Sequence, residues 1–260
     1  MAQYAFVIGD VHGQHGKAVQ LCSDAASATG LRPDTILQVG DFNPALTQAD
    51  VESVPAPARY RRLGDFSVWG HRYPAELIHI GGNHEPVRML EPIWSGGEVA
   101  SGVRFLGRAG VLERCGLRIG GLSGNYRARD YDQPLPVLSP DNSNRKGLLH
   151  IRKSDVDKLL AEPPVDILLM HDWPRRIAEA SGLLFGRNNG ECGYQEGDAI
   201  IDALNPRIVL LGHMHWFRDF MVDGMRCISM GAVCDEAVPA NERCVILRID
   251  DVGGVELVRW

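Results

Sequence analysis

Side chains that bind metal ions follow five short apolar runs in this sequence. The runs cover residues 4–8, 35–39, 76–80, 165–170 and 207–211. Runs of this length that are rich in Val, Ile and Leu predict buried strands flanked by helices. The polar residues that follow these runs are Asp10, His12, Asp41, Asn83, His84, His171, His213 and His215.

These eight side chains predict a metal site. The carboxyl ends of parallel strands share one edge of a sheet, and ligands bind at that edge in open α/β folds. Oxygen and imidazole donors without a thiolate suit Mn²⁺, Zn²⁺ or Fe²⁺. Eight donors exceed the needs of one tetrahedral ion, so we expect two ions that share a bridging carboxylate. Each motif alone also fits an ordinary turn or helix cap, and it is their combination that indicates the metal site.

Helical patterns separate several of the apolar runs. Residues 15–29 are rich in alanine and end at Gly30, as a helix does. Residues 154–161 begin with the spacing of a capping box, formed by Ser154 and Asp157. A shorter helix is expected over residues 197–204. The alternation of strands and helices predicts an α/β fold.

From about Trp216 onward, the pattern changes from alternating strands and helices to successive strands. Four runs of strand type are joined by short turns, which predicts a second, more antiparallel sheet that closes the core. We expect these strands at residues 217–222, 225–229, 244–249 and 255–258. Two stretches show no clear pattern: residues 46–73, and the polar, proline-containing residues 126–146, which predict a long loop of the kind that is often functional.

Composition narrows the function classes. The chain has 260 residues and a net charge of −6, so we expect no extended nucleic-acid track, and a phosphate-bearing ligand would need local positive charge. The six cysteines form no CxxC pair. No basic segment precedes the first strand, and no apolar run approaches the ~20 residues of a membrane span. These features lead us to expect a cytoplasmic protein with free thiols and no membrane contact.

The motifs resemble those of the calcineurin-like metallophosphoesterases in order and type. They are Gly9-Asp10-Val11-His12-Gly13, Gly40-Asp41, Gly82-Asn83-His84-Glu85, His171 and Gly212-His213-Met214-His215. The resemblance implies a four-layer αββα sandwich, in which two mixed β-sheets are flanked by helices, as a single domain over residues 1–260. It also implies two divalent metal ions: Mn, Fe or Zn.

The same resemblance assigns a role to each position. The first metal would be bound by Asp10, His12 and His215, and the second by Asn83, His171 and His213. Asp41 would bridge the two ions and take part in catalysis. A metal-bound hydroxide would attack phosphorus in line. His84 would stay off the metals and either protonate the leaving oxygen or hydrogen-bond the phosphate. Of the two roles open to Glu85, orienting His84 or forming an exposed ion pair, we favour the ion pair.

A closer resemblance points to the lariat RNA debranching enzymes, which hydrolyse 2′–5′ phosphodiester bonds. The matching blocks begin at Gly81, Gly121, Leu149 and Asp166, and the last contains His171-Asp172-Trp173-Pro174. That family usually has cysteine where this chain has Asp10, and its eukaryotic members carry an additional C-terminal region that we do not expect here.

Arginines and aromatics beside these blocks are candidates for substrate contacts. Guanidinium groups hold phosphate bidentately, and aromatic rings stack on bases. The candidates are Asn83, Tyr126, Arg127, Arg129, Arg152 and Arg175, with Tyr131, Trp173 and Trp216 as further stacking residues. A solvated arginine face and aromatic core packing explain them equally well. Arg59, Arg61 and Arg62 are expected on a solvated helix face.

The sequence therefore predicts a two-metal phosphodiesterase that acts on a nucleotide or on short or branched RNA. A phosphomonoesterase, including a protein serine/threonine phosphatase, fits the same ligand motifs. A non-catalytic scaffold is the third possibility, and it would predict a missing ligand or a missing His84. The sequence does not indicate an oligomeric state.

Overall fold

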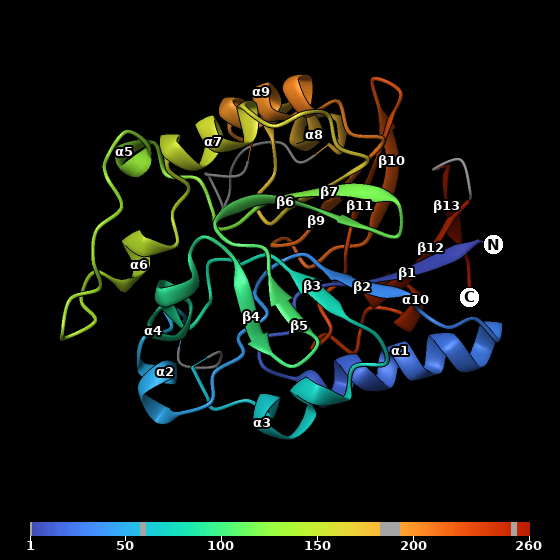
Figure 1. The fold of residues 1–260 in the computed structure, drawn as a ribbon, viewed down its shortest axis with the longest axis horizontal. Helices are drawn as coiled ribbons and strands as arrows, with labels where there is room; N and C mark the ends of the chain where they lie inside the picture. The colour runs from blue at the N-terminus through green and yellow to red at the C-terminus, as the bar shows by residue number, and fades with distance from the viewer. Residues whose placement is uncertain (1, 58–60, 183–192, 251–253) are drawn as a thin grey trace.

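Two β-sheets pack face to face between layers of helices (Figure 1). The computed structural model describes residues 2–57, 61–182, 193–250 and 254–260. The first sheet has the strand order β13-β12-β1-β2-β3-β5-β4, and the second has the order β10-β11-β9-β8-β7-β6. Both sheets are mixed, since parallel pairs occupy their centres and antiparallel pairs their margins. The α/β sandwich expected from the sequence is confirmed.

The central strands of the two sheets agree with the runs that end in polar residues. The first sheet comprises β13 (Val255–Val258), β12 (Cys244–Ile249), β1 (Gln3–Ile8), β2 (Thr35–Gln38), β3 (Leu77–His79), β5 (Val103–Phe105) and β4 (Gly97–Ala100). The second comprises β10 (Arg218–Val222), β11 (Met225–Ser229), β9 (Ile208–Leu211), β8 (Ile167–Met170), β7 (Leu117–Leu122) and β6 (Ala109–Arg114).

The alternation of side chains along each central strand divides the core into three layers. In β1, Ala5 and Val7 face the second sheet, where they meet residues such as Leu169 of β8. Their neighbours Phe6 and Ile8 face the opposite way and pack against α1 (His15–Thr29). Since successive side chains of a strand point to opposite faces, a strand covered on both sides reads as a continuous apolar run.

Helices α7 (Lys153–Leu160), α8 (Arg175–Ala180) and α9 (Gln195–Leu204) cover the outer face of the second sheet. The remaining helical segments are single turns, and most of them lie in the connections. They are α2 (Gln48–Glu52), α3 (Phe66–Trp69), η1 (Gly70–Arg72), α4 (Val87–Leu90), η2 (Glu91–Ile93), α5 (Ala128–Tyr131), α6 (Arg145–Leu148) and α10 (Ala240–Arg243). No helix in the described ranges is long and apolar enough to cross a membrane.

One expectation about the sheets was wrong, and one region had no prediction. The four late strands do not form a sheet of their own: β10 and β11 extend the second sheet, whereas β12 and β13 join β1 in the first. Pairing between strands far apart in the sequence decides which sheet each strand joins, and the hydrophobic periodicity of a strand does not indicate its pairing partner. The structure also contains β4 to β7 between Gly97 and Leu122, where the sequence patterns predicted no strand.

The helix at residue 153 begins differently from the expected capping box. The carboxylate of Asp155 accepts a hydrogen bond from the backbone N–H of Arg152 at 2.9 Å, so α7 begins at Lys153 rather than Ser154. The guanidinium of Arg108 donates a hydrogen bond to the same carboxylate at 2.7 Å. A buried ion pair therefore joins the start of α7 to the chain before β6.

The stretch 46–73, which lacked a pattern, contains the residue that caps α1. Asp65 accepts hydrogen bonds from the backbone N–H groups of His15 (2.6 Å) and Gly16 (3.1 Å). These are free donors at the start of α1, because Gln14 makes no side-chain cap there. Asp65 thus caps α1 from a distant segment. That segment lies against Gly13, three residues from Asp10.

Two buried histidines pack around Phe42, His15 from α1 and His79 from β3. His15 contacts the hydroxyl of Tyr73 at 3.0 Å, and His79 stacks on Phe42 with ring centroids 4.3 Å apart. Burial lowers the pKa of His15 to about 4 and that of His79 to about 3. Both rings are therefore neutral in the folded protein at pH values where the unfolded chain binds a proton.

This difference predicts that the free energy of unfolding is highest above pH 6.5 and falls as the pH is lowered from 6.5 towards 4. Each histidine contributes a slope of about 1.4 kcal/mol per pH unit. His79→Asn, which keeps a donor near the position of Nδ1, should reduce the slope by about that amount. Urea denaturation at several pH values with a metal chelator present measures it. The exposed His71→Asn serves as control, and identical slopes for all three proteins would contradict the assignment.

Candidate metal centre

The predicted ligands meet where the two sheets face one another. Asp10 and His12 follow β1, Asp41 follows β2, and Asn83 and His84 follow β3 in the first sheet, whereas His171 follows β8 and His213 and His215 follow β9 in the second. The sequence predicted one sheet edge for all of them. The structure corrects this, because the central parallel strands of both sheets end on the same side of the molecule.

Asp10, His12 and His215 form the first group. Their donor atoms lie within 4.8 Å of one another. The Nε2 atoms of His12 and His215 are 3.1 Å apart, and Nε2 of His215 lies 3.2 Å from Oδ2 of Asp10. The Asp10 carboxylate also accepts the backbone N–H of His213. Two imidazole nitrogens and a carboxylate oxygen thus converge on one point.

Asp41 lies beside His171 in the second group, which also includes Asn83. Its Oδ1 is 3.5 Å from Nε2 of His171, and its Oδ2 is 3.8 Å from Nε2 of His12, which belongs to the first group. Nε2 of His171 is also 3.0 Å from Oδ1 of Asn83. The His213 ring stacks edge-on against His171 with centroids 5.0 Å apart. Asp41 therefore touches residues of both proposed metal sites.

The backbone around these ligands is tightly constrained. His12, Asp41, His213 and His215 all have φ between 49° and 72°, a region that side chains other than glycine rarely adopt and that clusters at functional sites. A Cβ atom at Gly82 would lie 2.1 Å from Oδ1 of Asp41. The glycine is needed here because the β3 loop approaches the Asp41 carboxylate.

The charge balance of the site fits divalent cations. Asp10 and Asp41 are 0% and 1% exposed, and the groups that lower their pKa are histidines rather than arginine or lysine. Burial opposes ionisation of Asp41, yet His171 and His84 hold its pKa well below the usual value. Burial also lowers the pKa of His171, but the Asp41 and Asp10 charges outweigh it and raise that pKa. Two buried carboxylates that depend on histidines for compensation suit positive ions among those donors.

A backbone contact orients His171. Its Nδ1 lies 2.9 Å from the carbonyl oxygen of Val39, and the N–H donates to that oxygen. This assigns the tautomer and leaves the Nε2 lone pair directed at Asp41 and Asn83, an arrangement typical of metal-ligating histidines.

His84 differs from the other histidines in exposure and in its partner. Its Nδ1 lies 3.1 Å from Oδ2 of Asp41, and its backbone N–H donates to Oδ1 of Asp41 at 2.7 Å. Its side chain is 17% exposed, whereas those of His12 and Asp41 are 1%. His12, Asp41 and His84 also satisfy the distance for a ligand group. The greater exposure of the His84 side chain beside these buried ligands favours a substrate-facing role.

The exposed ion pair expected for Glu85 is wrong. Glu85 is 0% exposed, and its carboxylate accepts the backbone N–H groups of Phe42 (2.8 Å), Asn43 (2.8 Å) and Gly82 (3.0 Å). Burial and the nearby Asp41 raise its pKa to about 7. Glu85 therefore ties the loop after β3 to the loop after β2, and so fixes the positions of the ligands on both.

The substrate-contact candidates divide into two groups. Arg127 is half-buried, and the negative charge of the nearby Asp172 favours the charged form of its guanidinium. Asp172 was missed as a site residue, although it stands in the His-Asp-Trp-Pro block. Its carboxylate accepts the backbone N–H of Tyr126 at 2.8 Å and acts on His213. The Tyr126 segment is thereby attached beside the metal centre.

Arg152 and Arg129 lie farther along the same loop. Arg152 is 3% exposed, and its guanidinium donates to the carbonyl oxygens of Asp130 and Gly147. Arg129 is 79% exposed. Both line a cavity of about 580 Å³ that also contains Lys146. Arg175, in contrast, lies exposed at the start of α8, where its charge acts on Asp198 of α9.

The aromatic candidates belong to several environments. Tyr126 stacks on Tyr194 at 5.0 Å, with Tyr131 packed beside it. Trp173 is fully buried and donates its indole N–H to the carbonyl of Gly212, so it is a core residue. Trp216 is 46% exposed.

Arg61 and Arg62 do not lie on a helix face as expected. Arg61 and Arg62 are exposed in an irregular segment next to the Asp65 cap, and Arg59 lies outside the described residues. Among the cysteines, Cys22, Cys115, Cys227, Cys234 and Cys244 are free thiols, and Cys192 lies outside the described residues.

The two facing sheets and the ligand cluster at their seam fit one class of protein, the metallophosphoesterases. The model of the calcineurin-like phosphoesterase family matches residues 5–217, and the chain belongs to this family. The resemblance inferred from the motifs is thereby confirmed.

Curated relatives point to one branch of the family. A lariat debranching enzyme of Danio rerio is 35% identical over 226 residues, covering 80% of this chain and 39% of that protein. The human lariat debranching enzyme is 32% identical over 80% of this chain and 41% of its own length, and that of Arabidopsis thaliana is 35% identical over 80% and 53%. The chain thus spans about two fifths of the length of the first of these relatives.

Solved structures support the fold. The protein TT1561 of Thermus thermophilus aligns over 100% of this chain and 99% of its own, with a TM-score of 0.51 and 14% identity. A putative 5′-nucleotidase of Staphylococcus aureus aligns over 100% of this chain and 53% of its own, with a TM-score of 0.52 and 12% identity.

The position of Asp41 predicts that Asp41→Asn weakens metal binding at both groups. The substitution removes the charge that His12 and His171 both approach, while an amide preserves the shape. Metal content by mass spectrometry and affinity by calorimetry with Mn²⁺ measure the effect. Asp219→Asn, on β10, is the control for loss of one carboxylate. Two ions bound with the wild-type affinity would exclude Asp41 as the shared ligand.

Proposed function

We propose that this protein is a two-metal phosphodiesterase that acts on nucleic acid and cleaves branched or short RNA. The observation that carries the proposal is the sharing of Asp41 between two ligand groups, one containing His12 and the other His171. Paired metal sites joined by one carboxylate are suited to in-line displacement at phosphorus. The similarity to lariat debranching enzymes supports branched RNA as the substrate class.

The residues take the roles that their positions suggest. Asp10, His12 and His215 would hold one ion, and Asn83, His171 and His213 the other, with Asp41 between them. Bound divalent ions supply positive charge to the phosphoryl oxygens and lower the pKa of water. Their identity as Mn, Fe or Zn belongs to the proposal, because the nitrogen and oxygen donors suit all three.

His84 is the proposed proton donor. Its Nδ1 lies 3.1 Å from Asp41 and its side chain is 17% exposed, so the proposal places the leaving oxygen at the exposed part of the imidazole. A positioned general acid contributes about 10²- to 10⁴-fold in rate. Asn83, one residue before, presents an amide that can also hydrogen-bond a phosphoryl oxygen.

The loop cavity supports recognition of a polyanion. Arg152 lies buried in its wall and donates hydrogen bonds to carbonyl oxygens, which leave its positive charge in place. Among the described residues that line the cavity, the one acidic side chain is Asp130, and it is engaged by His150 at 2.5 Å. Arg129 and Lys146 add two further cations. We propose that this cavity holds a phosphate of the RNA distant from the bond that is cut, and that Arg127 and Tyr126 lie between it and the metals.

For His84→Ala we expect both metals to be retained and kcat on a phosphodiester to fall by about 10²- to 10⁴-fold, since each proposed ion keeps Asp41 and its other assigned ligands when His84 is removed. The exposed His71→Ala provides a matched control. Metal counting and steady-state kinetics on the same preparations test this. Loss of metal in proportion to loss of activity would instead make His84 a ligand.

The substrate proposal is tested with a 2′–5′ branched RNA beside its linear 3′–5′ counterpart, with Mn²⁺ added. Selective cleavage at the branch is expected. Lys146→Ala should raise KM for the branch and reduce the dependence of log KM on log salt by about 0.7 per lost phosphate contact. Hydrolysis of a simple chromogenic diester with neither RNA cut would leave a phosphodiesterase of another substrate. Hydrolysis of a chromogenic phosphomonoester without hydrolysis of the diester would favour the phosphomonoesterase.

A further inference from the structure

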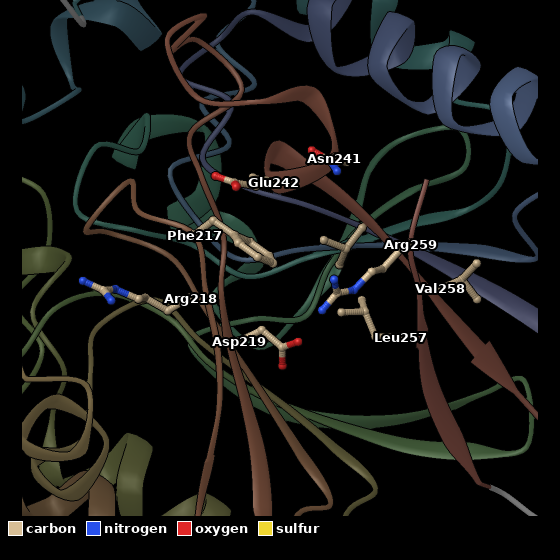
Figure 2. Close-up of a pocket in the computed structure, with 9 residues that line it drawn as sticks. Phe217, Arg218, Asp219, Asn241, Glu242, Leu257, Val258 and Arg259 are labelled. Atoms are coloured by element: carbon tan, nitrogen blue, oxygen red, sulfur yellow. The ribbon is translucent and has the colours of Figure 1, made fainter.

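A second cavity lies where the edges of the two sheets separate. Strand β10 is the edge of the second sheet and β13 is the edge of the first. Between them is a space of about 390 Å³, closed at one end by α10 (Figure 2). Its volume falls within the range of small-molecule sites. It is separate from the loop cavity beside Arg152, since no residue lines both.

The walls combine an apolar surface with a few polar groups. Phe217 and Leu257 pack partly buried at the margin of the core between the sheets. In Figure 2 the Phe217 ring and the Arg259 guanidinium extend into the space between the strands, whereas Arg218 points away from it. An aromatic face opposite an aliphatic side chain provides a slot for a flat ring.

Polar groups give this slot a defined hydrogen-bonding edge. Asp219 is held by Arg226 through two contacts of 2.8 Å, so its carboxylate has a fixed position and retains free lone pairs. Arg259, an exposed side chain, adds guanidinium donors, and Glu242 of α10 adds a second carboxylate to the lining. Asn241 of α10 adds an amide that both donates and accepts. Donors and acceptors are therefore both available to a planar ligand that carries the two kinds of group on its edge.

The slot is close to the metal centre along the chain. Phe217 follows the ligand His215 by two residues, so their Cα atoms are at most about 7 Å apart. On the opposite wall, the carbonyl of Arg243 at the end of α10 accepts the N–H of Gly9 at 3.1 Å, and Gly9 precedes the ligand Asp10. A group bound in the slot would thus lie near a phosphate at the metals.

We propose that this slot between β10 and β13 binds a nucleobase of the substrate, stacked on Phe217 and hydrogen-bonded by Asp219, Asn241 and Arg259. The proposal rests on the proposed function, because a base one nucleotide from the scissile phosphate is what a nucleic-acid phosphodiesterase would place there. Stacking on an aromatic ring contributes to the binding of any base, and the polar edge adds preference among bases.

The test uses guanosine and adenosine, which lack phosphate and so do not depend on the metals. Each is titrated into the full chain, and methyl NMR signals are followed. We expect shifts at the methyls of Leu257 and Val258, which line the slot, and none at Met221, which is exposed farther along β10. Phe217→Leu and Arg259→Ala should each weaken nucleoside binding at least fivefold, and Met221→Ala should not change it.

Kinetics separate this inference from the function on which it rests. Phe217→Leu should lower the ratio of kcat/KM for a dinucleotide to that for a chromogenic diester at least fivefold. Absence of methyl shifts up to the solubility limit, together with an unchanged ratio, would overturn the base site while leaving the phosphodiesterase intact. Shifts at Leu257 and Val258 in a chain that cuts no phosphodiester would reject the proposed function and retain the base site.

Discussion

The burial of two carboxylates at the seam between the sheets is the constraint on which the rest of the site depends. Asp10 and Asp41 are almost completely enclosed, and histidines rather than lysine or arginine lower their pKa values. Buried charge without compensation is costly. The imidazoles that lower these pKa values, His171 and His215 for Asp10 and His171, His84 and His12 for Asp41, offer partial compensation, and divalent cations would complete it. Charge balance thus explains why this family's site combines acids with histidines.

Holding those charges requires support from outside the ligand set. Glu85 collects three backbone N–H groups from two loops, so it orders the segments that carry Asp41 and Asn83. Asp65 plays a comparable part for the first loop by capping α1. Both contacts satisfy buried or terminal donors that would otherwise lack partners. The loops that carry the ligands are therefore held by hydrogen bonds from residues outside the ligand set, and a site held in this way suits preorganised catalysis.

In the proposed function, substrate recognition would be distributed around this centre rather than concentrated in a basic surface. The chain carries a net charge of −6, yet local cations gather at the loop cavity with Arg152. The slot at Phe217 offers aromatic and polar contacts instead. Phosphate charge and base shape would accordingly be recognised on different elements, the first on the loop before α7 and the second between two sheet edges. Such a division permits affinity without an extended positive track.

The sequence alone determined the class of the protein, because each ligand follows a local apolar run, in most cases with a glycine between them, and such local patterns can be recognised without knowledge of the fold. It predicted β1, β2, β3, β8 and β9 and the types of their terminal residues. Tertiary structure decided which sheet each late strand joins, why Glu85 is buried, and where Asp65 caps α1. Those outcomes arise from pairing and packing between segments far apart in the chain, for which periodicity and spacing contain no information.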